Sequence, residues 1–355
     1  MSQENQNIQE EPHKRRVRYK GKYPKNYKEK YKELNPEKYQ DTIEKVIRKG
    51  STPAGMHISI MVKEILDFLQ IKPGQIGFDA TLGYGGHTRA MLECLKGQGH
   101  MYATDVDPIE SAKTKKRLAE AGFGEDILTI KLQNFCTIDE IAKEAGGFDF
   151  VLADLGVSSM QIDNPDRGFS FKVDGPLDLR LNPEKGISAA ERLAGIGEEE
   201  LAGMLWENSD EPYAEELAHA IVTEIKHGKP IETTTRLREV IEETLSFLPE
   251  KERKDTVKKT CQRTFQALRI DVNNEFEVLY EFMEKLPGAL KPGGRAAILT
   301  FHSGEDKLVK KALKQGYKEG IYSKIANDVV RPSAEECAQN GRARSTKMRW
   351  AVRAE

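Results

Sequence analysis

The chain has 355 residues, of which 38% are hydrophobic and 32% charged, with a formal net charge of −2. This is enough to bury an ample core in one large or two modest domains. No apolar run approaches membrane-spanning length and the polar start lacks a secretory signal, so we expect a cytoplasmic protein without a membrane partner. The four cysteines are scattered without C-x-x-C spacing, which indicates neither a disulfide framework nor a zinc site, and we expect no metal.

The first 50 residues differ from the rest of the chain in charge. They carry 14 lysines and arginines against 8 acidic residues, or +6, which leaves −8 for the remainder. Ten of the basic residues lie between Lys14 and Lys32, interleaved with tyrosines at a spacing of four. Such a mixture can neutralise phosphates and stack on bases, which favours nucleic acid as a partner. A solvated, flexible basic leader, or a helix with a tyrosine stripe, is the alternative.

Residues 76–107 carry the pattern around which the other motifs are arranged. An apolar strand pattern runs into a glycine loop with Gly83, Gly85 and Gly86, followed by a helical pattern and a second strand that ends at Asp105. This is half of a doubly wound nucleotide fold, where glycines admit a cofactor and the carboxylate accepts hydrogen bonds from ribose hydroxyls. Dinucleotides and S-adenosylmethionine (SAM) both bind such a crevice. The alternative is a tight strand-to-helix turn, with Asp105 capping the next helix.

Two further apolar runs, residues 126–135 and 147–159, are typical of buried parallel strands. Their carboxyl ends should line the same crevice. Phe135 would stack on the adenine of a cofactor, or else belong to the core. Asp154 would end the fourth strand beside the reactive end of the cofactor, and the small residues after it indicate a backbone bent to admit a substrate. A structural helix cap is the alternative for Asp154.

Residues 161–259 interrupt the alternation of strands and helices, which predicts an inserted, mostly helical subdomain. Two apolar stripes, within 214–225 and 237–248, indicate its core. Near its start, Phe169 and Phe171 lie in a turn-rich segment where aromatic rings could hold a flipped base. Alternatively, the two rings attach the insertion to the core of the protein.

The alternation resumes after the insertion. One long helix is expected over 263–283, then L-K-P-G-G-R as a turn into a fifth strand, and finally an antiparallel closing strand, T-K-M-R-W-A-V-R. An antiparallel last strand fits a seven-stranded methyltransferase sheet better than a six-stranded dehydrogenase sheet, and so favours SAM. We predict an α/β, Rossmann-like class I SAM-dependent methyltransferase domain over 51–160 and 260–355, a leader over 1–50 and a helical insertion over 161–259.

Motifs spread along residues 55–355 resemble a known family. They read H-x-x-I-M-x-x-E, D-A-T-L-G-Y-G-G-H-T, D-L-G-V-S-S-M-Q, R-G-F-S-F, G-P-L-D-L-R, R-T-F-Q-A-L-R-I and F-H-S-G-E-D. The chain is similar to the bacterial 16S ribosomal RNA cytosine N(4)-methyltransferases, the MraW or RsmH family. The resemblance implies a SAM-dependent enzyme with an RNA-recognition insertion that methylates the exocyclic amine of a decoding-centre cytosine in the small ribosomal subunit. By matching motifs, the cofactor-binding residues would be Gly85, Gly86, His87, Asp105, Phe135, Asp154 and Gln161.

The expected chemistry makes Asp154 the candidate catalytic residue. Methyl transfer needs a nucleophile positioned in line with an electrophilic methyl group. The cytosine amine is a poor nucleophile because its lone pair is delocalised, so an acceptor for one N–H, Asp154 or a nearby carbonyl, would favour bond formation. Amine methylases more often carry D-P-P-Y here, and D-L-G-V lacks that aromatic ring. Phe169 or Phe171 is therefore the candidate stacking platform.

Three features depart from the family pattern: the basic leader, Gly304 in place of the usual leucine, and a shortened segment between His302 and Arg342. They leave open a divergent paralogue that modifies another ribosomal RNA position. A non-catalytic ribosome assembly factor on the same fold is a second alternative, although the loop glycines and strand-end carboxylates are intact. The sequence also leaves the oligomeric state open, a homodimer included.

Removing residues 1–50 should weaken binding to ribosomal RNA without changing SAM affinity or the target nucleotide, because phosphate contacts position an RNA but do not specify its sequence. The truncated protein should also show a shallower dependence of log affinity on log salt. RNA binding measured over a series of salt concentrations checks this. A methyl group moved to another nucleotide, or an unchanged salt slope, would contradict it.

Overall fold

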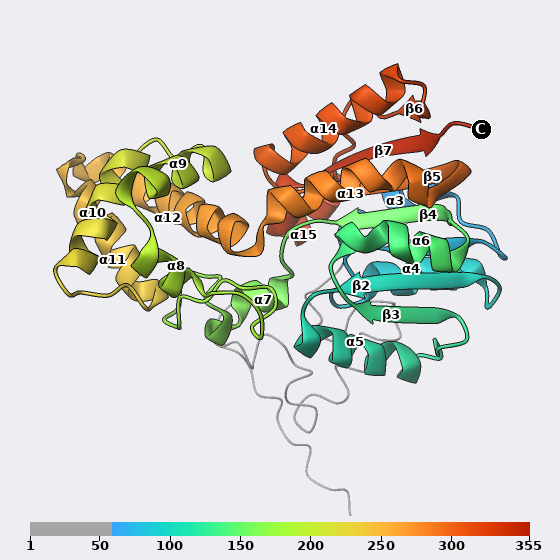
Figure 1. Ribbon diagram of the computed structural model, residues 1–355, viewed down its shortest axis with the longest axis horizontal. Helices are drawn as coiled ribbons and strands as arrows, with labels where there is room; N and C mark the ends of the chain where they lie inside the picture. The colour runs from blue at the N-terminus through green and yellow to red at the C-terminus, as the bar shows by residue number, and fades with distance from the viewer. Residues whose placement is uncertain (1–58) are drawn as a thin grey trace, which may run out of the picture. The chain divides into compact units, whose positions relative to one another are not determined.

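The computed structural model describes residues 59–355 (Figure 1), and the expected leader over 1–50 lies outside the described residues. A seven-stranded sheet has the order β3-β2-β1-β4-β5-β7-β6. Its strands are β1 (Ile76–Asp79), β2 (His100–Asp105), β3 (Leu128–Leu132), β4 (Phe148–Asp154), β5 (Leu290–Thr300), β6 (Tyr322–Ile325) and β7 (Lys347–Arg353). The order reverses between β1 and β4, and ligands of doubly wound sheets bind in the crevice at such a switch point.

Strand direction identifies the fold class. The five neighbouring strands β3, β2, β1, β4 and β5 run parallel. Strand β7 is antiparallel to both of its neighbours, β5 and β6. In the β5–β7 ladder Ala297 pairs with Trp350. This order and polarity are those of class I SAM-dependent methyltransferases, so the predicted fold class and the antiparallel closing strand are confirmed. The short strand β6 was missed, because four residues carry too little alternation to be recognised.

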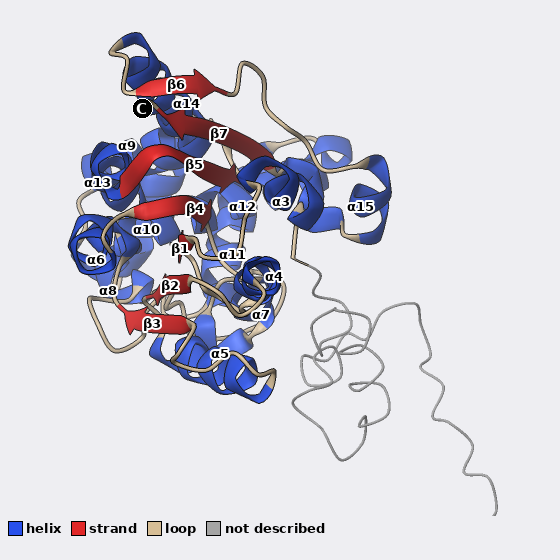
Figure 2. Cartoon of the chain, turned by 90° about the vertical axis from the view of Figure 1, so that its right-hand side faces the viewer, coloured by secondary structure: helices blue, strands red, loops and turns tan. Residues whose placement is uncertain are grey.

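Helices cover both faces of the sheet. Alternate residues of β4 point to opposite sides, as a pleated strand requires: Val151 and Ala153 join one hydrophobic cluster, Phe150 and Leu152 the other. The first cluster includes residues of α6 (Ile138–Ala145), α13 (Glu275–Ala289) and α14 (Ser303–Lys318). The second includes residues of α3 (Val62–Leu69), α4 (Gly86–Leu95) and α5 (Pro108–Glu120). Figure 2 shows α6 and α13 on one side of the strands, with α3 and α4 on the other.

A group of helices is inserted between β4 and β5. It contains α7 (Ser159–Asp163), α8 (Ala189–Gly195), α9 (Glu198–Ser209), α10 (Ala214–Lys226), α11 (Thr234–Thr244) and α12 (Glu250–Asn273). The two predicted apolar stripes are buried in α10 and α11, and they pack in a cluster with α9 and the second half of α12. The predicted boundary at residue 259 thus falls inside α12, whose later residues Phe265 and Leu268 belong to the same cluster. The division into domains itself stays a prediction.

The single long helix expected over 263–283 is wrong, because the structure has two helices, α12 and α13, that meet at Asn274. Asn274 has a left-handed φ of 49°, and its N–H bonds to the carbonyls of Asp271 and Ile270. Asparagine tolerates this conformation and often ends helices. The apolar periodicity continues on both sides of the break, which is why periodicity alone suggested one helix.

Asn273, the last residue of α12, connects the helices to the turn-rich segment after α7. Its Nδ2 donates to the Leu179 carbonyl at 2.8 Å, and its Oδ1 accepts from the Leu181 N–H at 2.7 Å. Leu179, the first of these two partners, is buried and has a left-handed φ of 63°. A non-glycine residue holds this conformation only where the surroundings determine it, so Asn273 helps to fix the shape of this segment.

None of the helices between residues 59 and 355 is long and apolar enough to cross a lipid bilayer.

Gly77 gives a test of the packing inside the sheet. A Cβ atom at this position would lie 2.1 Å from Cε2 of Phe150 and 2.6 Å from Sδ of Met101, closer than any real contact. Gly77→Ala should therefore lower the free energy of unfolding by about 1–3 kcal/mol, as overpacked cores do. Urea denaturation measures the change.

The matched control is Gly203→Ala in α9, where a Cβ atom would meet nothing within 4 Å. That variant should gain roughly 1 kcal/mol, because alanine favours helices more than glycine does. Equal effects of the two substitutions would contradict the packing described for Gly77.

Candidate functional site

Three parallel strands end in aspartates at one edge of the sheet. Asp79 ends β1, Asp105 ends β2 and Asp154 ends β4. Burial raises the pKa of Asp105 to about 6, although hydrogen bonds from the N–H groups of Asp107 and Gly83 act to lower it. Burial also raises the pKa of Asp79. Carboxylates shifted in this way, in a crevice, are candidates for function. The prediction that Asp105 and Asp154 end their strands at this edge is confirmed.

The glycine loop joins β1 to α4. Gly85 has a left-handed φ of 83°, and a Cβ atom on it would lie 2.7 Å from Cγ2 of Thr114 in α5. The Thr114 hydroxyl also donates to the Gly83 carbonyl at 2.6 Å. Gly85 is thus required by the turn and by close packing on α5, which is the alternative given for this loop. Gly86 begins α4, and His87 follows it.

The loop and the second strand are connected through Asp105. Its Oδ2 accepts from the N–H of Gly83 at 2.8 Å, and its Oδ1 accepts from the N–H of Asp107 at 2.9 Å. Each carboxylate oxygen has two lone pairs, so both can accept one further hydrogen bond. The geometry therefore leaves Asp105 able to receive two hydroxyl groups while it fixes the loop.

A buried network beside this site was missed by the sequence analysis. Asp107 is fully buried and caps α5 by accepting from the N–H groups of Ile109 and Glu110. Its Oδ2 accepts from Nη1 of Arg167 at 2.7 Å and from Nε2 of Gln161 at 3.0 Å. Asp107 followed by proline is a recognisable helix start, but no local signal links it to residues more than 50 positions away. The side chain of Gln161, predicted to bind the cofactor, is thus engaged with the protein.

Asp154 differs from the other carboxylates in lacking donors. About a quarter of its side chain is accessible, at 27%, but its Oδ1 atom is buried and has no hydrogen-bond partner. Its Oδ2 lies 3.4 Å from Nδ1 of His87. Burial raises the pKa of Asp154 to about 6, opposed by His87 and reinforced by the carboxylates of Asp79 and Glu305. A buried acceptor without a donor is costly, which marks Asp154 as the place for an incoming donor.

His87 holds a defined orientation beside Asp154. Its Nε2 lies 2.8 Å from the carbonyl oxygen of Ile60. A carbonyl only accepts, so Nε2 carries the proton and, in the neutral ring, Nδ1 presents a lone pair towards Asp154. Nδ1 of His87 and Oδ2 of Asp154 are then both acceptors, so a hydrogen bond between them requires one additional proton. The two atoms are close enough to share it.

The predicted aromatic residues lie in two hydrophobic clusters. Phe135 is half-buried and packs edge-to-face on Phe282 of α13, with ring centroids 5.2 Å apart. Phe169 is 8% exposed, and Phe171 packs edge-to-face on Phe265 of α12 at 5.7 Å. Phe169 and Phe171 both belong to the cluster formed by the inserted helices themselves, so they pack within the insertion. Their role in base stacking stays a prediction.

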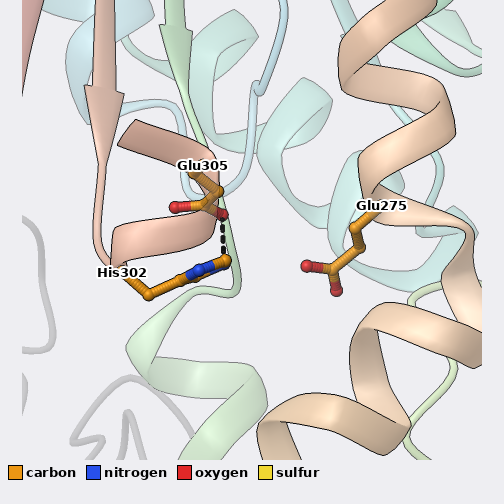
Figure 3. Close-up of side chains that lie close together, drawn as sticks. All are labelled: Glu275, His302 and Glu305. Atoms are coloured by element: carbon orange, nitrogen blue, oxygen red, sulfur yellow. Dashed lines mark ion pairs between the residues drawn. The ribbon is translucent and has the colours of Figure 1, made fainter. Parts of the chain in front are cut away.

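A second charged group lies after the end of β5. Figure 3 shows the His302 ring facing the carboxylate of Glu305, with that of Glu275 opposite them. Nε2 of His302 lies 3.1 Å from Glu305, and Arg269 donates to both oxygens of Glu275 at 2.8 and 2.9 Å. Burial opposes ionisation of Glu305, but His302, the Phe301 N–H and Arg269 outweigh it and lower its pKa. Both carboxylates have protein partners, so the group is an ion-pair cluster that orders the start of α14.

Known proteins resemble this chain over nearly its whole length. The model of the MraW methylase family matches residues 54–354. A protein named ribosomal RNA small subunit methyltransferase H 1, from Agathobacter rectalis, is 84% identical over 347 residues, covering 98% of this chain and 99% of the relative. One of the same name from Lachnoclostridium phytofermentans is 72% identical over 346 residues, covering 98% and 94%.

A more distant relative extends the comparison. The ribosomal RNA small subunit methyltransferase H of Thioalkalivibrio sulfidiphilus is 38% identical over 320 residues, covering 85% of this chain and 98% of the relative. These matches confirm the resemblance that the motifs indicated. The chain therefore belongs to the MraW methylase family.

Proposed function

We propose that the protein transfers the methyl group of SAM to the exocyclic amine of a cytosine in small-subunit ribosomal RNA. The names of its relatives support the RNA substrate, and the family motifs support the cytosine amine of the decoding centre. The observation that carries the proposal is the buried Oδ1 atom of Asp154, an acceptor without a donor at the carboxyl end of β4. An amine needs such an acceptor where it reacts.

The residues at the sheet edge fit SAM. The two oxygens of Asp105 keep lone pairs for the ribose hydroxyls, and the loop at Gly85 and Gly86 lets a ligand approach the backbone. We assign the adenine to Phe135, and we assign His87 and Gln161 to the walls of this site. When bound, SAM supplies a methyl group on a positively charged sulfur. The protein holds the amine in line with it and excludes water.

Asp154 then acts as the proton acceptor. With a pKa of about 6, the carboxylate is ionised at neutral pH. This pKa is also close enough to the working pH for the carboxylate to take a proton from the amine. Accepting one N–H through Oδ1 directs the nitrogen lone pair out of the ring plane as the new bond forms. The lone pair on Nδ1 of His87, 3.4 Å from Oδ2, can share the proton taken up.

The helical insertion is proposed to recognise the RNA. It follows Asp154 directly, and Arg167 connects its first loop to the Asp107 carboxylate at the sheet edge. Of the two candidate stacking residues, Phe171 is only half-buried, whereas Phe169 is 8% exposed. Phe171 is therefore the better candidate for contact with the base. The oligomeric state and the cytoplasmic location stay predictions.

The relatives bear on the choice between the main family enzyme and a paralogue. The family model begins at residue 54, whereas the 84% identical relative aligns over 98% of this chain and must include most of the leader. Relatives that align over 97–98% of this chain carry the number 1 (84% and 72% identical) or 2 (63% and 54% identical) in their names, whereas the 38% identical one, aligned over 85%, carries none. This supports a distinct, leader-bearing branch with the same chemistry. Mapping methylated cytosines in ribosomal RNA from a deletion strain identifies its nucleotide.

Replacing Asp105 tests the cofactor site. Asp105→Ala should weaken SAM binding by roughly 1–3 kcal/mol, the loss expected for charge-assisted hydrogen bonds. Titration calorimetry on the purified chain measures it, with Asp255→Ala, an exposed aspartate of α12, as the control. Unchanged affinity in the Asp105 variant removes it from the site, and binding of NAD in place of SAM would revive the dehydrogenase interpretation.

Replacing Asp154 tests the reaction. Asp154→Asn keeps the shape but removes the proton acceptor, so tritium transfer from labelled SAM to small ribosomal subunits should fall by about 10²–10⁴-fold. In the wild type the rate should rise with pH through about 6 and then level off, as the carboxylate with its raised pKa ionises. A wild type that transfers no tritium to any ribosomal substrate would favour the assembly factor. A fully active Asp154→Asn variant would overturn the assigned role.

A further inference from the structure

After its first turn, helix α14 exposes a face made of lysines. These are Lys307, Lys310, Lys311, Lys314 and Lys318, hereafter the lysine face. At about 100° per residue the five positions fall within a third of the helix circumference, and the acidic residues of α14 lie outside this arc. Glu305 and Asp306 are buried on other sides of the helix, where Asp306 pairs with Arg349 and Lys347. The exposed charge of α14 is therefore strongly positive in a chain whose net charge is −2.

The lysine face has almost no compensating carboxylates. Among the described residues only Asp210 comes within ion-pair distance, 3.9 Å from Nζ of Lys307. Helix α5 provides the contrast, since its three lysines each pair with a glutamate: Lys113 with Glu110, Lys115 with Glu125 and Lys116 with Glu120. Five like charges on neighbouring turns repel one another, which disfavours the arrangement unless a polyanion binds there.

The lysine face begins beside the reaction site. Helix α14 starts at Ser303, directly after β5, whose neighbour β4 ends at Asp154. A cleft at this point is lined by Asp210, which follows α9, by Phe276 of α13, and by Ser303 and Lys307 of α14. Figure 1 shows α14 running outward along the β6 edge of the sheet, away from the inserted helices. From Lys307 to Lys318 the face extends for about 16 Å at the rise of an α-helix.

We propose that the lysine face binds the phosphate backbone of the ribosomal RNA substrate, leading the strand away from the site where its cytosine reacts. The inference rests on the proposed function and adds an RNA-contact surface to those expected of the leader and the insertion. Lysines act as point charges that neutralise phosphates without reading bases. A lipid surface fits less well, because the one large hydrophobic side chain that α14 exposes, Tyr317, lies beside the face and not within it, and a single ring offers little to enter a bilayer.

Two triple variants with equal loss of charge test the proposal. Lys311, Lys314 and Lys318 are changed together to glutamine, and in the control Lys113, Lys115 and Lys116 are changed in the same way. Binding of a labelled single-stranded RNA is measured over a range of potassium chloride concentrations. Each lost phosphate contact should make the plot of log affinity against log salt shallower by about 0.7, so the α14 variant should lose about 2 from its slope. The α5 variant should keep the wild-type slope.

Methyl transfer to small ribosomal subunits is measured on the same proteins. The α14 variant should raise KM at least tenfold and leave kcat unchanged at saturating substrate, because these lysines bind RNA but do not touch the reacting atoms. Equal weakening by both variants would reduce the effect to net charge and overturn the proposal, as would an unchanged slope in the α14 variant. Failure of the wild type to methylate contradicts the proposed function instead, because the two RNA-binding slopes are compared without catalysis.

Discussion

The cost of burying carboxylates at the end of a parallel sheet governs this structure. Asp79, Asp105, Asp107 and Asp154 converge where β1, β2 and β4 end, and each loses hydration there. The protein compensates three of them: the Thr88 hydroxyl donates to Asp79, the glycine loop to Asp105, and Arg167 to Asp107. Of these four aspartates, Asp154 alone has a buried side-chain oxygen without a donor. The loop and helix starts around the site are therefore arranged to supply hydrogen bonds.

The hydrogen bonds that compensate the buried Asp107 also connect the sheet to the segment that leads into the inserted helices. Arg167 donates to Asp107 beside the carboxyl end of β2 and also to the carbonyls of Arg180 and Leu181 in the loop that follows. Asn273 fixes that loop to the end of α12. The pair of Arg167 and Asp107 is almost fully buried, so losing either partner would leave an uncompensated charge. The position of the inserted helices thus depends on residues at the same edge of the sheet as the strand-end aspartates.

The fold could be predicted from the sequence because the patterns that indicate its strands lie within short segments of the chain. Apolar runs ended by glycine or aspartate located β1, β2 and β4, and the antiparallel β7 separated the methyltransferase sheet from a dehydrogenase sheet. The failures involve contacts between distant positions. The pairing of Asp107 with Arg167 spans 60 positions and has no periodic trace. The sequence left open whether Phe169 holds a base or packs, because the helices of its cluster lie farther along the chain. The break at Asn274 depends on one backbone conformation within a continuous apolar pattern.

The incomplete compensation of Asp154 makes this enzyme a proton-linked system. Its pKa is raised from 3.8 to about 6 in the folded state, so the folded protein keeps a proton that the unfolded chain releases. The stability that this carboxyl contributes is fully present below pH 3.8 and is lost as the pH rises through about 6. A ligand that donates a hydrogen bond to Oδ1 favours the ionised form and expels the proton. Ligand uptake at mildly acidic pH is thus accompanied by proton release into the medium, and the occupied protein regains at neutral pH the stability that the empty one has lost.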